Sequence, residues 1–323
     1  MIEYNILSDS KITDNQWDNF VDSTDNGTIF HKRLFLSYHP KGRFHDSSIA
    51  FTKNEQLFAL FPAAVIEREG KKNLISHAGT SYGGFIYKSN LNFREAFDLV
   101  ESVIEIAKSL KCERIQLTPP PMIYQSKYSN YIDFALVKNG FNYLKRDVSS
   151  VVQLDIENDD LLSTYRSEAR TAVKKSIKQG IEIAECDKFE EYYEILKKNL
   201  KMRHNVNPTH SLEELLKLKH LFPGKIRLWG AFKDGKLIAG VCNFSVNSKV
   251  VLAFYISHDE DYQEYRAVNL LFYEIMKRYK NEGFKFLDFG IFTVNMDPNW
   301  GLARFKENFG ARGIFRDTFY KDI

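Results

Sequence analysis

The sequence is poor in the features that mark secreted, membrane-spanning and metal-binding proteins. Its 323 residues contain three cysteines, which lie far apart and form no CxxC pair. They argue against a disulfide framework or a zinc ribbon and indicate a reducing compartment. The chain does not open on a basic start with an apolar run, and no stretch approaches ~18 uninterrupted apolar residues. We therefore expect a cytoplasmic protein without a membrane span, and the scattered histidines predict no metal site.

Motifs for nucleotide binding and hydrolysis are also missing. The sequence has no GxGxxG, GxxxxGKS/T, HExxH or GxSxG, so dinucleotide, P-loop, zincin and hydrolase interpretations have no support. The 45 Lys and Arg residues nearly balance the 42 Asp and Glu residues, so composition gives no reason to expect DNA as a partner. With 44% hydrophobic and 14% aromatic residues, the chain has enough apolar material for a globular core.

A weak internal duplication predicts the fold. Residues 47–67 and 226–246 each read as a strand, a polar turn and a second strand. In both halves a further strand, a helix of 3.6-residue period and a buried-looking strand follow. We expect an α/β (α+β) fold of two tandem GNAT-like domains, each a mixed β-sheet flanked by helices, at 1–150 and 151–323. Convergent local patterning is the alternative explanation.

A row of cations marks one predicted helix. Residues 160–180 are expected to form a helix that Asp160 or Ser163 caps and Gly180 ends. Its cations recur at four-residue intervals beside an apolar row, so they share one face; they are Arg166, Arg170, Lys174 and Lys178. Such a row favours a nucleotide diphosphate or a tRNA backbone as ligand. A solvated helix face is the alternative. Arg203, before a predicted loop, is a further candidate.

One stretch argues against a standard CoA site. An acyl-CoA-dependent acetyltransferase would carry a glycine-rich turn at a helix N-terminus within residues 257–271, to hold the pyrophosphate. This stretch contains no glycine and four acidic residues, Asp259, Glu260, Asp261 and Glu264. The acids would repel a diphosphate, or they simply favour the dipole of a helix N-terminus. Both interpretations disfavour a CoA cradle.

The C-terminal third resembles a known family. "GLARFKENFG" (301–310) is similar to a motif of the second domain of Fem proteins, the aminoacyl-tRNA-dependent transferases that build peptidoglycan interpeptide bridges and have GNAT-like relatives. The family pattern has a tyrosine-bearing strand, an Arg-x-x-Asn helix start, a strand ending in Asp-x-Gly, and Gly-Leu-x-x-Phe-Lys-x-x-Phe-Gly. The matching residues are Tyr255, Arg266, Asn269, Asp288, Gly290, Gly301, Leu302, Phe305, Lys306, Phe309 and Gly310.

The rest of the chain resembles the family more loosely. The basic helix at 160–180 is similar to the one that opens the family's second domain, and 27–40 resembles its entry segment. Two departures from the family pattern bear on the identity of the acceptor and the donor. The long helical hairpin of some members has no room here. The stretch 78–87 matches the family only in part, with Tyr82 as its one large polar aromatic before the glycines.

The resemblance implies an acyl transfer in which an acceptor amine attacks an activated ester or thioester. It assigns Lys306 to the reacting centre, where it would stabilise the developing negative charge. Read without the motif, Lys306 is a surface residue of an amphipathic helix. Asp288 is a candidate base or a cap of the following turn. The expected substrate-binding residues are Phe305, Tyr255, Arg266, Asn269, Arg166, Arg170, Lys174, Arg203 and Tyr82.

Three functions remain open at this point. The first is transfer of an aminoacyl group from tRNA to an amine acceptor, such as a cell-envelope precursor. The second is a CoA- or carrier-protein-dependent N-acyltransferase acting on a sugar amine or an amino acid. The third is a non-catalytic protein that binds a nucleotide sugar. We expect no tightly bound cofactor; the donor co-substrate would be aminoacyl-tRNA or an acyl thioester.

Overall fold

The computed structural model describes residues 2–6, 12–68, 70–76, 78–157 and 160–323, except for the side chains of Arg203 and His204. The chain forms two compact units. Unit 1 comprises Met1–Asp147 and Phe315–Ile323, and unit 2 comprises Val148–Ile314. The sequence placed all of 151–323 in the second domain, whereas the last strand lies in unit 1. No helix of the described residues has both the length and the apolar character to cross a membrane.

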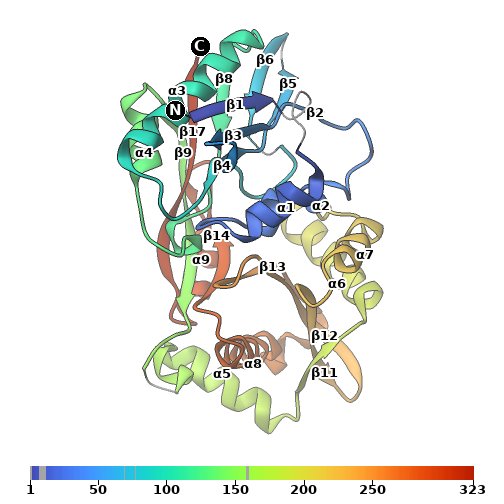
Figure 1. The fold of residues 1–323 in the computed structure, drawn as a ribbon. Helices are drawn as coiled ribbons and strands as arrows, with labels where there is room; N and C mark the ends of the chain where they lie inside the picture. The colour runs from blue at the N-terminus through green and yellow to red at the C-terminus, as the bar shows by residue number, and fades with distance from the viewer. Residues whose placement is uncertain (1, 7–11, 69, 77, 158–159) are drawn as a thin grey trace. The chain divides into compact units, whose positions relative to one another are not determined.

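Unit 1 contains two sheets, with strand orders β1-β3-β4-β7 and β17-β8-β6-β5-β2 (Figure 1). Its strands are β1 (Ile2–Ile6), β2 (His45–Asp46), β3 (Ile49–Lys53), β4 (Gln56–Phe61), β5 (Ala64–Arg68), β6 (Lys71–Ile75), β7 (Ile86–Tyr87), β8 (Arg114–Leu117), the start of β9 (Asn142–Gln153) and the end of β17 (Arg312–Asp322). Its helices are α1 (Asp14–Asp22), η2 (Ile29–His31), α2 (Arg33–Leu36), α3 (Phe93–Ser109), η3 (Met122–Tyr124) and α4 (Tyr131–Lys138).

Unit 2 contains a sheet of order β10-β11-β12-β13-β14-β9, in which only β13 and β14 are parallel neighbours. Its strands are β10 (Glu182–Cys186), β11 (Ile226–Lys233), β12 (Lys236–Ser245), β13 (Val250–His258), β14 (Phe286–Ile291), β15 (Thr293–Val294) and β16 (Asp297–Pro298). Its helices are η4 (Leu161–Thr164), α5 (Ser167–Lys178), α6 (Phe189–His204), α7 (Leu212–Leu221), η5 (Glu260–Tyr265), α8 (Ala267–Asn281) and α9 (Trp300–Glu307).

The predicted duplication is confirmed. The hairpins β3–β4 and β11–β12 both turn on two residues with positive φ, Asn54 and Glu55 in unit 1, and Asp234 and Gly235 in unit 2. Two positive φ values give the turn a twist that matches that of the strands. In each unit one long helix connects two parallel strands: α3 lies between β6 and β8 in sequence, and α8 lies between β13 and β14.

Helix α5 begins later than the sequence predicts. Asp160 caps the short helix η4, and α5 follows with Arg166 as its N-cap residue. Helix α5 packs beside α8 at the lower end of Figure 1 and buries Ala169 and Val173 in the core of unit 2. Ile177, the next residue of the apolar row four positions after Val173, is exposed. The row ends early because α5 is in its last turn there and Gly180 redirects the chain.

Gly310, which follows α9, lies tightly against the end of η4. It has a φ of +81°, and a Cβ at this position would lie 2.8 Å from the carbonyl oxygen of Thr164. Gly310→Ala should therefore lower the free energy of unfolding by about 2–5 kcal/mol, from backbone strain plus overpacking. Gly283, with a φ of +87° and no atom near its Cβ position, is the matched control. Gly283→Ala should cost only the strain of about 1–2 kcal/mol in urea denaturation. An equal decrease in the free energy of unfolding for Gly310→Ala and Gly283→Ala would show that Thr164 moves aside.

Candidate active site

Two parallel strands separate at the candidate site. In the described part of unit 2, β13 and β14 pair only where Val250–Leu252 face Phe286–Asp288. Beyond this point both strands continue, and the register of β14 with β9 shifts between Asp288 and Ile291. Gly290, inside the shift, has a φ of +72°. Such an irregularity redirects main-chain groups that a regular ladder would use, which is a frequent feature of functional sites.

Lys306 lies at this irregularity and points inward. Its Nζ donates hydrogen bonds to the carbonyl oxygens of Gly290 at 2.8 Å and Ile291 at 2.7 Å. The residue is only 2% exposed, so the exposed position that the helical pattern alone indicates is wrong. Burial lowers the pKa of Lys306 to about 8, against a smaller opposite effect of Asp288. Loss of hydration disfavours the ammonium, while the two carbonyls and the nearby carboxylate keep it in place.

Asp288 stabilises the irregular segment of its own strand, β14. It is fully buried, and its Oδ1 accepts hydrogen bonds from Ser149 Oγ at 2.6 Å and from the backbone N–H of Gly290 at 2.7 Å. Asp288 therefore accepts from a nearby backbone N–H, as a cap would, but it does so within β14 and not at a turn after the strand. Ser149, on β9, was not predicted, because a serine inside an apolar strand carries no signal of its partner.

Phe305 and Phe309 connect Lys306 to the core. Phe309 is fully buried, and Phe305 is half-buried with its ring centroid 5.1 Å from that of Phe309. Both residues pack with the hydrophobic core of unit 2. Helix α9 is therefore fixed by its aromatic residues, and this fixes the position of Lys306.

Tyr255 lies on β13, beyond the residues that pair with β14. Its hydroxyl accepts a hydrogen bond from the backbone N–H of His210 at 3.1 Å and lies 2.9 Å from His210 Nδ1. Burial raises the pKa of Tyr255 to about 12, so the phenol is neutral at physiological pH. Among the described residues, no hydrogen bond joins Tyr255 to Lys306. His210 was not predicted as a site residue, because its partner Tyr255 is far away in sequence.

The predicted Arg266 and Asn269 lie at the start of α8, Arg266 as its N-cap residue and Asn269 in its first turn. Arg266 is exposed and has a φ of +54°, and its carbonyl accepts a hydrogen bond from the N–H of Asn269 at 3.0 Å. At the start of the acidic turn between β13 and α8, Asp259 Oδ1 accepts a hydrogen bond from the N–H of Asp261 at 3.3 Å. A carboxylate of the protein therefore caps η5, the short acidic helix that precedes α8.

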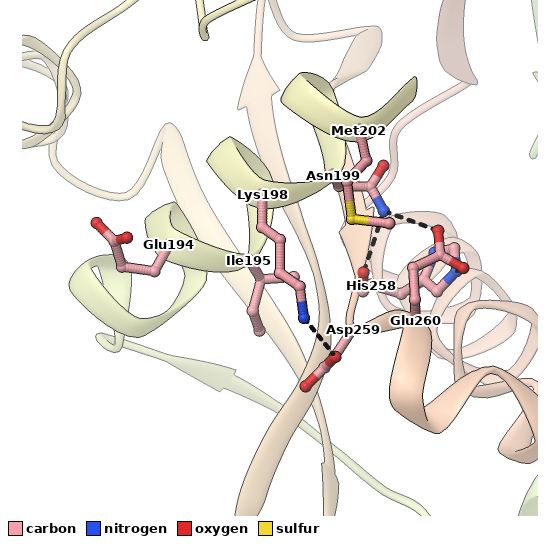
Figure 2. A pocket seen from close by; sticks show the side chains of 8 residues that line it. All are labelled: Glu194, Ile195, Lys198, Asn199, Met202, His258, Asp259 and Glu260. Atoms are coloured by element: carbon pink, nitrogen blue, oxygen red, sulfur yellow. Dashed lines mark hydrogen bonds and ion pairs between the residues drawn. The ribbon is translucent and has the colours of Figure 1, made fainter. Parts of the chain in front are cut away.

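A pocket of about 240 Å³ opens beside this turn (Figure 2). Asn199, on α6, donates from its side-chain nitrogen to the carbonyl oxygen of His258 at 3.2 Å and to Glu260 at 3.4 Å. Three carboxylates line the pocket against one lysine, so its charge disfavours an anionic ligand. The lining residues are Glu194, Ile195, Lys198, Asn199, Met202, His258, Asp259 and Glu260.

The predicted basic row is exposed, but its members differ in their partners. Arg166 forms an ion pair with Glu307 of α9 at 2.5 Å. Arg170, Lys174 and Lys178 are exposed, and none of them forms an ion pair with the described residues. The side chain of Arg203 lies outside what the structure describes, and its role stays a prediction.

Tyr82 belongs to unit 1 and is buried there. Its ring centroid is 5.1 Å from that of Tyr124, and the guanidinium of Arg316 lies 4.8 Å from the Tyr82 ring. Arg316 also donates a hydrogen bond to the carbonyl oxygen of Ser81 at 2.7 Å. Among the predicted residues, the structure thus brings together Lys306, Asp288 and Phe305 in unit 2. Tyr255, Arg266 with Asn269, and the α5 row lie on separate elements of that unit.

Comparison with known proteins concerns the fold that contains this site. A family model described as acetyltransferase (GNAT) domain matches residues 163–317. Residues 163–317 are therefore similar in sequence to a GNAT domain. This stretch contains the separated strands β13 and β14, the acidic turn and Lys306. A search of curated proteins gave no match.

Solved structures share the fold of the whole chain. FemX is similar with a TM-score of 0.77 at 15% identity, over 99% of this chain and 97% of FemX. The C-terminal domain of a putative lysylphosphatidylglycerol synthetase from Agrobacterium fabrum gives a TM-score of 0.60 at 13% identity, covering 96% and 92% of the two chains. A tandem GNAT protein from the clavulanic acid biosynthesis pathway gives 0.55 at 11% identity, covering 100% and 98%. The predicted tandem GNAT-like fold, and the resemblance to Fem proteins at the level of the fold, are confirmed.

Proposed function

We propose that the GNAT domain transfers an aminoacyl group from tRNA to the amine of an acceptor, forming an amide. The acceptor would be a nucleotide-linked cell-envelope precursor, in line with the fold shared with FemX. The observation that carries the proposal is the buried ammonium of Lys306 at the point where β13 and β14 separate. A preorganised cation in a site shielded from water is suited to stabilise charge that develops during acyl transfer.

The reaction requires little beyond positioning and charge stabilisation. The acceptor nitrogen attacks the ester carbonyl carbon, and the carbonyl oxygen becomes negatively charged. The bond from this carbon to the tRNA ribose oxygen then breaks, and the proton lost by the amine passes to that oxygen. In this scheme Lys306 stabilises the oxyanion, while Asp288 and Ser149 hold the segment of β14 whose carbonyls orient Lys306.

The choice of tRNA over CoA rests on charge. The name of the matching family model makes acetyl-CoA the rival donor. A CoA diphosphate would meet Asp259, which already accepts from the N–H of Asp261, and a pocket lined by three carboxylates. Free cations lie instead on α5, where Arg170 and Lys174 are exposed. A polyanion that follows a helix face fits this distribution better than a compact diphosphate at the turn.

A donor competition assay tests the proposal. The purified protein is incubated with labelled aminoacyl-tRNA, or with labelled acetyl-CoA, and with an amine-bearing nucleotide-linked muropeptide or phosphatidylglycerol as acceptor. We expect labelled amide with aminoacyl-tRNA and the muropeptide. Product with acetyl-CoA alone would overturn the choice of donor. Tight nucleotide-sugar binding without turnover from either donor would favour a non-catalytic protein.

The α5 row gives a quantitative test of donor binding. The double substitution Arg170→Ala and Lys174→Ala should raise KM for aminoacyl-tRNA and leave kcat nearly unchanged, because the proposal gives these residues contacts with phosphate only and no part in the acyl transfer. Loss of two phosphate contacts should reduce the slope of log affinity against log salt by about 1–2. Lys108→Ala with Lys138→Ala, two exposed residues of unit 1, removes the same charge and is the control. An equal effect of both pairs would contradict a specific role of α5.

A further inference from the structure

Trp300 is unusually exposed for its size. It is the first residue of α9 and is 77% exposed, more than any other large apolar side chain that the structure describes. Its backbone position is fixed, since Asn299 Oδ1 caps the helix by accepting from the N–H of Leu302 at 2.9 Å. A single exposed apolar residue needs no explanation by itself. Whether the Trp300 ring can contribute to ligand binding depends on the residues around it.

Two ion pairs attach the Trp300 side of α9 to the start of α5. Arg304, one turn after Trp300, pairs with Glu168 at 2.9 Å, and Glu307 pairs with Arg166 at 2.5 Å. Residues four apart share a helix face, so the indole lies on the face that Arg304 extends towards α5. The exposed ring and the basic helix therefore belong to one surface of unit 2.

The α5 part of this surface carries more basic than acidic residues. Arg170, Lys174, Lys175 and Lys178 are exposed and form no ion pair within the described residues, while Glu168 is the one acid of α5. Three of them recur every four residues, which spaces their Cα atoms by about 6 Å along the helix. A line of unneutralised cations calls for a linear array of anionic groups.

We propose that Trp300 and the cations of α5 form a binding surface for single-stranded RNA, in which a base stacks on the indole and the phosphates follow α5. A flat aromatic ring beside a basic track is the arrangement by which single strands are bound without sequence readout. The inference rests on the proposed function, because the aminoacyl-bearing end of a tRNA is single-stranded. It adds the residue that would contact its bases.

An anionic membrane surface is the competing ligand, and the surface suits it less well. An interfacial helix needs an apolar face directed to the lipid. The apolar residues Ala169 and Val173 of α5 are instead buried in the core of unit 2. The carboxylate of Asp297, three residues before Trp300, is also exposed and would have to approach anionic headgroups.

The three tryptophans make a direct measurement possible. Trp17 is fully buried and Trp229 is 8% exposed, so collisional quenching of fluorescence by acrylamide reports mainly on Trp300. The probe is a single-stranded RNA of about 12 nucleotides, within the usual site size of ~4–16. We expect this RNA to quench the emission and to protect it from acrylamide, with an effect that weakens as salt rises. The same sequence as a duplex should do neither, because its bases are already stacked.

Substitution then tests the ring. Trp300→Ala should weaken binding of the fluorescently labelled RNA about 5- to 150-fold, as expected for the loss of one stacked base. Trp300→Phe should keep most of the affinity, and Tyr128→Ala, which removes an aromatic ring that is 61% exposed in unit 1, should have no effect. Unchanged RNA affinity of Trp300→Ala would overturn the inference. So would a blue shift of the emission with phosphatidylglycerol vesicles but no response to RNA.

The outcome is independent of turnover. The probe carries no amino acid, so binding through Trp300 can occur even if the protein transfers nothing from tRNA, and this result would refute the proposed function alone. Turnover with aminoacyl-tRNA that is insensitive to Trp300→Ala, together with unquenched fluorescence, would refute the stacking surface alone.

Discussion

Replacing Lys306 by methionine is expected to lower kcat about 100- to 1,000-fold, the usual cost of removing one donor that stabilises an oxyanion. Methionine is similar in length and apolar, so it fits a position that is 2% exposed. The substitution removes the two hydrogen bonds to Gly290 and Ile291 together with the charge. The binding of aminoacyl-tRNA should change far less than kcat, because in the proposed mechanism Lys306 acts on charge that develops in the transition state.

The pH dependence separates catalysis from structure. If the protonated lysine is the active form, kcat should fall as pH rises through the Lys306 pKa of about 8. Arg is charged throughout this range, so Lys306→Arg should abolish the alkaline decline even if its rate is lower. A decline at the same pH in Lys306→Arg would assign it to another group. Full activity of Lys306→Met in a correctly folded protein would remove Lys306 from the mechanism.

The lowered pKa of Lys306 also affects the free energy of unfolding, and the direction of this pH dependence is opposite to that expected for kcat. The ordinary pKa of lysine is 10.5, and burial lowers that of Lys306 to about 8. Between these values the unfolded chain binds the additional proton, so this residue's contribution to the free energy of unfolding rises with pH. Activity and stability should therefore respond in opposite directions above pH 8, which distinguishes titration of Lys306 from alkaline unfolding.

The sequence predicted the architecture because the signals are local and repeated. The Asp234-Gly235 turn, the apolar period of α8 and the parallel strands around it each follow from neighbouring residues. Unit 1 repeats the pattern, which supports the same topology twice. The return of β17 to unit 1 could not be predicted, because the partner of a C-terminal strand depends on residues far away in sequence.

Candidate site residues could be selected from the sequence only where they belong to the family motif. Helical periodicity assigns Lys306 to the surface, since it counts a lysine as polar and cannot see that Gly290 and Ile291 offer carbonyls. The family motif identified the residue but not its contacts. Ser149 and His210 gave no sequence signal, because their partners Asp288 and Tyr255 are distant along the chain.

Asp288 is expected to have the second large effect, on stability and on the pH profile. Asp288→Ala would leave the buried N–H of Gly290 and the hydroxyl of Ser149 without their acceptor. At about 1–3 kcal/mol for each unpaired group, the free energy of unfolding should fall by about 2–6 kcal/mol in urea denaturation. Ser149→Ala removes only one of the two donors and should cost about half as much.

Asp288→Asn tests its role without removing the acceptor. Its side-chain oxygen can still accept from Gly290 and Ser149, while the negative charge is lost. Because this charge raises the pKa of Lys306, its removal should lower that pKa further, below about 8. The alkaline decline of kcat should then move to lower pH, with nearly unchanged kcat at pH values below the decline. This result would identify Asp288 as a residue that positions Lys306 and tunes its charge.

A general base behaves differently in the same experiment. If Asp288 accepts the proton of the attacking amine, Asp288→Asn should reduce kcat about 100- to 10,000-fold at every pH, without moving the alkaline decline. The fully buried position of Asp288 and its two bonds to Ser149 and Gly290 favour the positioning role, since a base must reach the substrate. The acceptor amine would then lose its proton to the leaving ribose oxygen, so the reaction would need only one charged residue of the protein, Lys306, at its centre.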